Sequence, residues 1–248
     1  MIPGFLLALL FFVVSIPGYT AVAFVSAAAG STTGGGATQA SSTAQTHTAG
    51  NLLYVSAAFR NASVGCGSIT LSVADADGNT FTQIGSAWSS THMCQYHWYA
   101  KNIGGQADNV VTVTCSATCD VPGITVLEFS GLDTTTPLDN SSSGDNCNNC
   151  SSLTGTSFTT SADLFVAGAY VYDAAVISAG TAGTVDMTIP AGAADSNLHI
   201  TSGYSIETLS GSKETEVTIP AADYLTMMQA TFKAAAASPA IPRRSVIY

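Results

Sequence analysis

Short apolar segments of strand length, separated by turn residues, recur along the chain from residue 51 to residue 232. Most are rich in Val, Ile, Thr, Tyr or Phe, and in 68–74 the apolar Ile69, Leu71 and Val73 alternate with polar neighbours, as on a strand with one dry face. No window shows a sustained helical period with caps. The pattern predicts an all-β fold, an antiparallel two-sheet, jelly-roll-like sandwich. The expected strands are 23–27, 51–59, 68–74, 80–84, 93–100, 109–115, 123–130, 164–171, 184–189, 198–208, 214–219 and 225–232.

Two polar stretches interrupt this pattern. The segment 30–50 consists of small and polar residues and is expected to be a loop or a weakly held edge. The segment 133–152, crowded with Asn, Ser and Asp, is expected to be a long loop closed by two cysteines. The segments 49–59 (AGNLLYVSAAF) and 161–171 (SADLFVAGAYV) resemble each other and would each begin one half of a jelly roll. One echo of eleven residues is weak evidence for a duplication.

The charge composition excludes a nucleic-acid-binding protein. The chain has 6 Lys and Arg against 16 Asp and Glu, a formal net charge of -10, and only 9% charged residues. Such a chain cannot place a positive stripe along phosphates. Its 248 residues include 29 Ser and 31 Thr, so hydroxyl groups supply most of the polar surface.

The N-terminus predicts export. The uncharged run 5–16 (FLLALLFFVVSI) precedes Pro17-Gly18 and the small residues of Ala21-Val22-Ala23, as in a signal peptide cleaved after Ala23. We therefore expect a signal peptide at 1–23, a β-sandwich domain at 24–235 and a flexible tail at 236–248, with no membrane contact after cleavage. No Lys or Arg precedes the apolar run, and the alternative is an uncleaved anchor within 1–29.

Six cysteines fit an exported chain, because an oxidising compartment allows them to pair. The spacings C-x3-C and C-x2-C suggest that Cys115 pairs with Cys119 and Cys147 with Cys150, which leaves Cys66 for Cys94. Spacing alone does not determine connectivity. A zinc site formed by the two close pairs is the alternative.

Several motifs occur in a familiar order: SVADADGNTFTQIGS, WYAKNIGG, VLEFSGLDTTTPLD, TTSADLFVAGAY and MMQATFKAA. Together they resemble an uncharacterised module of secreted or surface proteins of environmental bacteria, over residues 24–235. The resemblance implies a β-sandwich that often accompanies immunoglobulin-like or other surface modules. It supplies no catalytic residues, and the six cysteines depart from it.

Two acids are candidates for glycoside hydrolysis, which requires a pair of carboxyl groups flanking one bond. Glu128 and Glu207 both lie inside expected strands, where Glu is normally avoided. No G-x-S-x-G elbow, phosphate loop or dinucleotide fingerprint is present. A secreted polysaccharide-degrading enzyme is therefore the alternative to a protein without catalytic residues.

Two clusters offer metal ligands. Asp75, Asp77 and Asn79 surround a Gly, as in a calcium loop, although an Asp/Asn/Gly turn also suits a hairpin. The segment 92–97 (HMCQYH) offers copper-type ligands, but strand alternation places Met93 and His97 on the opposite face from His92 and Cys94. We expect no metal or other cofactor beyond a possible calcium ion.

Aromatic side chains suggest a binding surface instead. Tyr96 and Trp98 share one strand face, as do Tyr170 and Tyr172, and such pairs stack on sugar rings when exposed.

Phe24 and Val25, at the new N-terminus, would be able to complete the sheet of a neighbouring copy by strand addition. The sequence therefore favours a secreted or cell-surface, non-enzymatic protein with a structural, adhesive or glycan-contacting role, whose partners are extracellular glycans, other surfaces or further copies of itself in a filament.

Overall fold

The computed structural model describes residues 21–32, 36–60, 68–89, 93–142, 144–172, 176–181, 183–195 and 198–236. These residues form an all-β, antiparallel structure without any helix. No membrane-spanning helix is therefore found within those ranges. The first nine strands are β1 (Ala23–Ser31), β2 (Ala37–Ser41), β3 (Gln45–His47), β4 (Leu52–Arg60), β5 (Leu71–Asp75), β6 (Thr82–Gln83), β7 (Trp88–Ser89), β8 (Met93–Ala100) and β9 (Gln106–Asn109).

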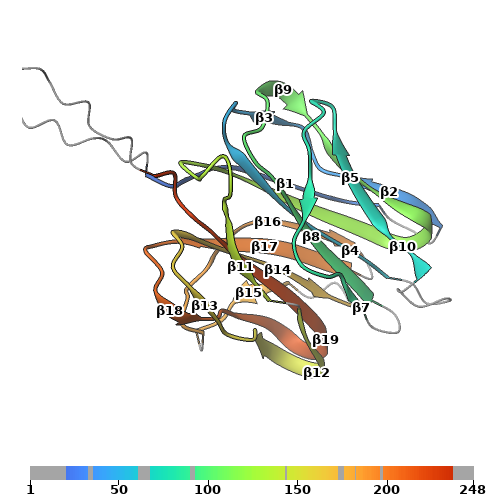
Figure 1. The fold of residues 1–248 in the computed structure, drawn as a ribbon. Coiled ribbons are helices and arrows are strands. Elements are labelled where there is room, and N and C mark those ends of the chain that lie inside the picture. Colours follow the sequence, from blue (N-terminus) through green and yellow to red (C-terminus); the bar gives the residue numbers. More distant parts are fainter. Residues whose placement is uncertain are drawn as a thin grey trace, which may run out of the picture.

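A long strand, β10 (Val111–Ser130), closes this first half, and a second half follows. Its strands are β11 (Leu138–Ser141), β12 (Asp145–Thr154), β13 (Phe158–Thr160), β14 (Leu164–Val171), β15 (Ser178–Ala179), β16 (Thr188–Asp195), β17 (Leu198–Ile206), β18 (Gly211–Lys213) and β19 (Glu216–Phe232). Figure 1 shows the first half, in blue to green, lying over the second half, in yellow to red.

The two halves repeat one topology. The main sheet of the first half has the order β1-β10-β4-β8-β6, and that of the second half has the order β11-β19-β14-β17-β16. Most of the remaining pairs correspond as well: β2 and β5 pair with β10 as β12 and β15 pair with β19, while β3 pairs with β9 as β13 pairs with β18. The pair β7–β8 of the first half has no separate counterpart among the described strands of the second half. The structure therefore contains the duplication that the sequence echo only suggested.

The registers make this correspondence exact at the residue level. In the first half Leu52 lies opposite Phe129, and in the second half Leu164 lies opposite Phe232. This equivalence aligns 52–60 with 164–172, which includes the segments that resemble each other in the sequence. The two sheets also meet face to face, with β1 on β16, β4 on β14 and β8 on β19. These contacts are those of a pseudo-two-fold axis running along β4 and β14.

The core consists of three buried layers. Alternate side chains of β4 and β14 point toward each other and form what we call the seam, which contains Leu52, Tyr54, Ser56, Ala58, Leu164, Val166, Gly168 and Tyr170. The intervening side chains point outward into a separate apolar cluster in each half. Both faces of β4 and β14 are thus buried, which explains their nearly continuous apolar sequences.

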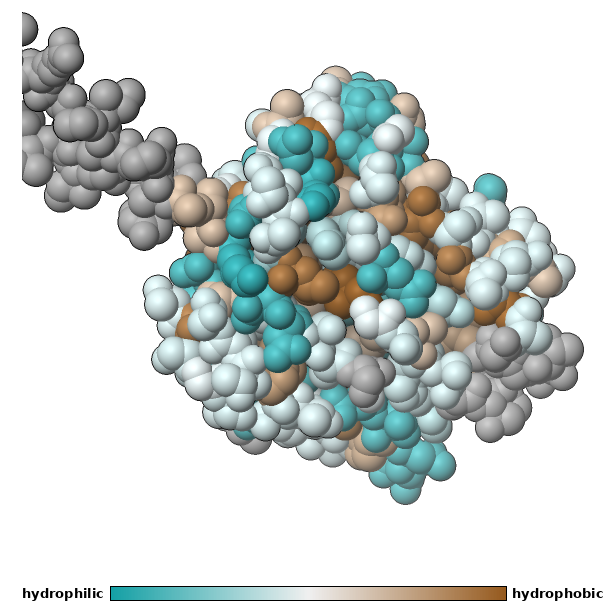
Figure 2. All heavy atoms as spheres, viewed as in Figure 1, coloured by the Kyte–Doolittle hydropathy of each residue, from teal (hydrophilic) through white to brown (hydrophobic). Residues whose placement is uncertain are grey.

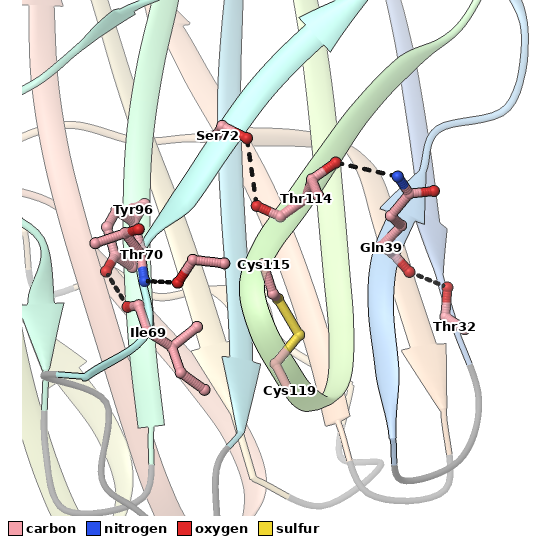
Figure 3. Close-up of a disulfide and its surroundings, with 10 residues drawn as sticks. Thr32, Gln39, Ile69, Thr70, Ser72, Tyr96, Thr114, Cys115 and Cys119 are labelled. Atoms are coloured by element: carbon pink, nitrogen blue, oxygen red, sulfur yellow. Dashed lines mark hydrogen bonds between the residues drawn. A yellow bond between two sulfur atoms is a disulfide. The ribbon is translucent and has the colours of Figure 1, made fainter.

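Two strands are longer than the sequence predicts. Most of the expected strand 109–115 and all of 123–130 belong to the single strand β10, and most of 214–219 and all of 225–232 belong to β19. Each bends, so that its first part covers the outer cluster while its last part lies in the main sheet. Cys115 and Cys119 are joined across the bend of β10 (Figure 3). There, Thr114 accepts hydrogen bonds from Gln39 of β2 and Ser72 of β5.

The prediction of a loop is wrong for 133–152, which contains strands, while 30–50 follows its alternative, because β2 is an edge strand that pairs with β10 alone. The segment 30–50 holds β2 and β3, and 133–152 holds β11 and most of β12. Few apolar side chains of these segments reach the core, among them Ala40 and Leu138. Hydrogen bonds help to hold 30–50 in place: Ser41 Oγ lies 2.8 Å from Thr112 Oγ1, and Thr43 N–H donates to the Ala29 carbonyl. Figure 2 shows a mostly pale, weakly polar surface, with brown apolar atoms gathered near the middle of that face.

The chain enters and leaves the domain at one end. Ala21, Val22 and Ala234 line a single pocket there, and Ala235 N–H donates to the Gly131 carbonyl. We call this the terminal end, and the opposite end, where β4 and β14 finish, the loop end. The signal peptide through Thr20 and the tail from residue 237 lie outside the described residues, so their predicted roles stay predictions.

Close packing at the seam makes a substitution at Gly168 informative. A Cβ there would collide with Ser56 Oγ and would lie 2.8 Å from His97 Nε2. We expect Gly168→Ala to lower the free energy of unfolding by about 2 kcal/mol, the usual cost of overpacking a core. Chemical denaturation measures the loss. Adding Ser56→Gly should recover most of it, and an unchanged midpoint for Gly168→Ala would contradict this packing.

Candidate functional site

The two acids proposed for hydrolysis are not brought together. Glu128 is fully buried in β10, where its carboxylate accepts hydrogen bonds from Thr48 N–H at 2.9 Å, Asn51 Nδ2 at 2.6 Å and Ser26 Oγ at 3.0 Å. Glu207 is exposed at the terminal end, where it lines a pocket that does not include Glu128. Glu128 therefore acts as a structural acceptor that ties β1 and the segment before β4 to β10.

A buried hydrogen-bond chain continues from this carboxylate. Gln45 Nε2 donates to Ser26 Oγ at 3.0 Å, and Gln45 Oε1 lies 3.4 Å from His47 Nε2. Asn109 Nδ2 lies 2.9 Å from His47 Nδ1 and also donates to Asp75 at 3.0 Å. Burial lowers the pKa of His47, although the negative charges of Glu128, Asp75 and Asp77 oppose this shift. The chain holds the polar strands β3 and β9 against the first half.

The calcium candidates lie at the far end of this chain of hydrogen bonds, which reaches Asp75. Asn79 N–H and Asn79 Nδ2 donate to the two oxygens of Asp75 at 2.9 and 2.6 Å, and Gly104 N–H donates to Asn79 Oδ1. Gly78 has a φ of 73°, so the residues form a hairpin turn that only Gly adopts without strain. Amide donors occupy both oxygens of Asp75 and Asn79 Oδ1, as in a hairpin turn. Calcium binding at this turn stays a prediction.

A second polar network occupies the seam. Gln95 Nε2 donates to the Gly168 carbonyl at 2.7 Å, and Thr226 Oγ1 donates to Gln95 Oε1 at 2.8 Å, so both bonds cross between the halves. Tyr54 OH lies 2.7 Å from His97 Nδ1. All these side chains are fully buried. The network fixes how one half sits on the other, because a shift would leave buried polar groups without partners.

The aromatic pairs suggested as sugar platforms are mostly internal. Tyr96 and Trp98 are only 7% and 4% exposed and stack on each other, with ring centroids 5.5 Å apart, in the outer cluster of the first half. Tyr170 is fully buried beside the seam. Only Tyr172 is partly exposed, at the loop end. Among these four residues, the exposure on which a sugar-contacting role depends is therefore found only in part, at Tyr172.

Partly exposed aromatic side chains do gather at the loop end, from both halves. The guanidinium carbon of Arg60, at the end of β4, lies 4.5 Å from the ring centroid of Tyr172. Tyr172 N–H donates to the Tyr224 carbonyl, and the Tyr224 and Trp88 rings are 6.2 Å apart. We call Arg60, Trp88, Tyr172 and Tyr224 the loop-end cluster. The Trp88 and Tyr224 rings are tilted by 46° to each other, and the cation of Arg60 lies over the Tyr172 ring.

The position of Arg60 could have been noticed in the sequence. Among residues 24–236 it is the single arginine, and it follows directly on the apolar run 52–59. It is equivalent to Tyr172 under the pseudo-two-fold relation, so the axis itself brings the two side chains together. The Tyr170 hydroxyl and Arg60 Nε are buried without hydrogen-bond partners in this region, and burial raises the pKa of Tyr170.

The cysteines largely follow the expected pairing. Cys115 is bonded to Cys119 and Cys147 to Cys150, which excludes the zinc site made of these four residues. Cys94 is also disulfide-bonded, but its expected partner Cys66 and the copper candidate His92 lie outside the described residues. In the described part of the chain, no group of three or more His, Cys, Asp or Glu side chains is arranged to hold a metal ion.

The residues suggested for assembly lie in the edge strand β1. Phe24 packs between Phe129 and Tyr204, stacking on Tyr204 at 4.8 Å, while Val25 is 40% exposed. The strand pairs with β10 from Ala23 to Ser31, and β2 follows on the first part of β10. A detachable segment would therefore be limited to β1. Its addition to a neighbouring copy stays a prediction.

Comparison of the chain with protein-family models, with curated proteins and with solved structures finds no match.

The buried ring of His97 predicts a loss of stability in acid. Burial lowers the pKa of His97 from 6.5 to about 3, so below pH 6.5 the unfolded chain takes up a proton that the folded chain does not. The free energy of unfolding should fall by about 1.4 kcal/mol per pH unit between these values, and His47 adds in the same direction. Urea titrations at several pH values measure the slope. His97→Gln should make it shallower, and an unchanged slope would contradict the assignment.

Proposed function

We propose that this chain is a non-enzymatic, extracellular surface protein that contacts glycans through the loop-end cluster. The observation that carries the proposal is the meeting of Trp88, Tyr172 and Tyr224 with Arg60, all partly exposed, at the end of the domain opposite to where the described chain enters and leaves it. A protein attached through either terminus would present this end outward.

The chemistry of the cluster supports a neutral, hydroxyl-rich ligand. Aromatic faces bind the apolar faces of sugar rings, while sugar hydroxyl groups need both donors and acceptors. Arg60 provides donors. The acid Asp120 lies opposite Arg60 on β10, and Asp223 lies on the equivalent strand β19 of the second half. Tyr170 experiences the charges of Arg60 and Asp223, which indicates that these groups share one region.

The rest of the structure supports a role in which the protein endures outside the cell. Two short disulfide loops and hydroxyl-rich strands suit an oxidising, protease-containing environment. The side chains usual in acid-base catalysis, Glu128, His47 and His97, are enclosed and engaged in hydrogen bonds. As part of the same proposal, we regard the duplicated sandwich as jelly-roll-like, exported by cleavage after Ala23, and held at the cell surface or secreted.

A binding screen tests the proposal. Affinity electrophoresis through gels containing neutral polysaccharides should retard the native protein, and Trp88→Ala or Tyr224→Ala should weaken retention by about tenfold, the loss of about 1.4 kcal/mol expected for one stacking ring. Phe158→Ala is the matched control, because Phe158 is a partly buried aromatic residue in the outer cluster of the second half. It should leave retention unchanged.

The same samples distinguish non-enzymatic binding from glycoside hydrolysis. A non-enzymatic protein releases no reducing sugar from any polysaccharide that retards it. Release that disappears in Glu128→Gln would establish the hydrolase instead. If no polysaccharide retards the native protein, contact through the loop-end cluster is contradicted. Equal retardation of the native protein and of Trp88→Ala would contradict it as well.

A further inference from the structure

A cavity of about 460 Å³ opens on the outer side of the second half, between β15, β16 and β17. Its walls are mainly apolar, and the polar side chains of Ser178, His199 and Thr201 also line it. Its size is within the range of small-molecule sites, which are typically apolar with a few polar groups. The apolar wall includes Val176, Ile177, Met187 and Ile189.

The equivalent place in the first half shows what this space accommodates. Tyr96 of β8 lies opposite Ala57, and Thr201 of β17 lies opposite the equivalent residue Ala169. In the first half, the Tyr96 ring fills the outer cluster between Trp98 and Phe59, with centroid distances of 5.5 and 6.4 Å. Its hydroxyl donates to the Ile69 carbonyl at 2.9 Å. The first half is therefore closed by a stack of aromatic rings.

The second half has lost this stack. The registers align Tyr96 with Thr201, Trp98 with Gly203 and Phe59 with Val171. Met187 occupies the place of the Trp98 ring, since a Cβ on Gly203 would collide with Met187 Cε. Thr201 is too small to replace Tyr96, and its hydroxyl donates to the Ala191 carbonyl at 2.7 Å. The cavity lies where a planar ring is missing.

We propose that this cavity binds a small planar aromatic molecule carrying one hydrogen-bonding group, in the place that Tyr96 fills in the first half. Ile177, Met187 and Ile189 contact the ring, and the polar substituent meets Ser178 or His199. Burying an apolar ring drives binding, and the polar substituent orients it. The site is separate from the loop-end cluster, and the proposal does not depend on glycan contact.

Methyl NMR of the native protein with p-cresol as the probe tests the proposal. The Cε methyl resonance of Met187 should shift and saturate as one site, because a bound ring lies against it. The matched control is Met228, which is buried in β19 on the seam side of the sheet, and its resonance should not move. Glucose added in place of p-cresol should shift neither, which separates this site from the proposed glycan contact.

A second experiment fills the cavity with a larger side chain. Thr201→Tyr restores the side chain found in the first half and should abolish the Met187 shift while raising the melting temperature. Thr201→Val replaces the hydroxyl by a methyl group and should bind p-cresol within about threefold of the native protein, a difference of about 0.65 kcal/mol at most. Shifts of Met187 that do not saturate, or that persist in a folded Thr201→Tyr protein, would overturn the proposal. If Thr201→Tyr does not fold, saturable movement of Met187 without Met228 still decides the question.

Discussion

Burial of β4 and β14 on both faces is the constraint on which the rest of the structure depends. A strand enclosed on both sides must be apolar or must find a partner for every polar atom. Ser56, Gln95, His97 and Thr226 satisfy this condition across the seam, where Gln95 bonds to the Gly168 carbonyl and to Thr226. Apolar contacts alone would allow the two sheets to slide over each other. Because these hydrogen bonds join one half to the other, they favour a single arrangement of the sheets.

The functional regions follow from this arrangement. The pseudo-two-fold axis emerges at the loop end, so Arg60 and its equivalent Tyr172 meet there and form the centre of a surface built by both halves. Away from the axis the halves are free to diverge. The outer cluster of the first half is closed by aromatic rings, whereas that of the second half keeps a cavity. A shared fold thus supports two different surfaces.

The sequence predicts the elements whose burial is apolar. The strands 93–100 and 164–171 begin and end as expected. The run 164–171 is apolar throughout, and in 93–100 alternate residues are apolar and enter the outer cluster. The sequence does not predict β2, β3 or the bends of β10 and β19, since hydrogen bonds from Ser, Thr, Gln and Asn place these segments. For the same reason Glu128 resembles a catalytic acid in the sequence but is a buried acceptor, and Tyr96 resembles a platform but lies in a core. Arg60 is conspicuous in the sequence as a lone arginine after an apolar run. Its contact with Tyr172, however, depends on how the two halves pack, which no local pattern reveals.

We expect the two equivalent halves to unfold as one cooperative unit, because the polar seam joins them. Native-state hydrogen exchange tests it most directly, because it reports the opening free energy of each backbone amide. The claim predicts that amides of β4 and β14 exchange most slowly, and with one common free energy equal to that of global unfolding. Different limiting free energies for the two strands, with one half opening while the other remains protected, would contradict it.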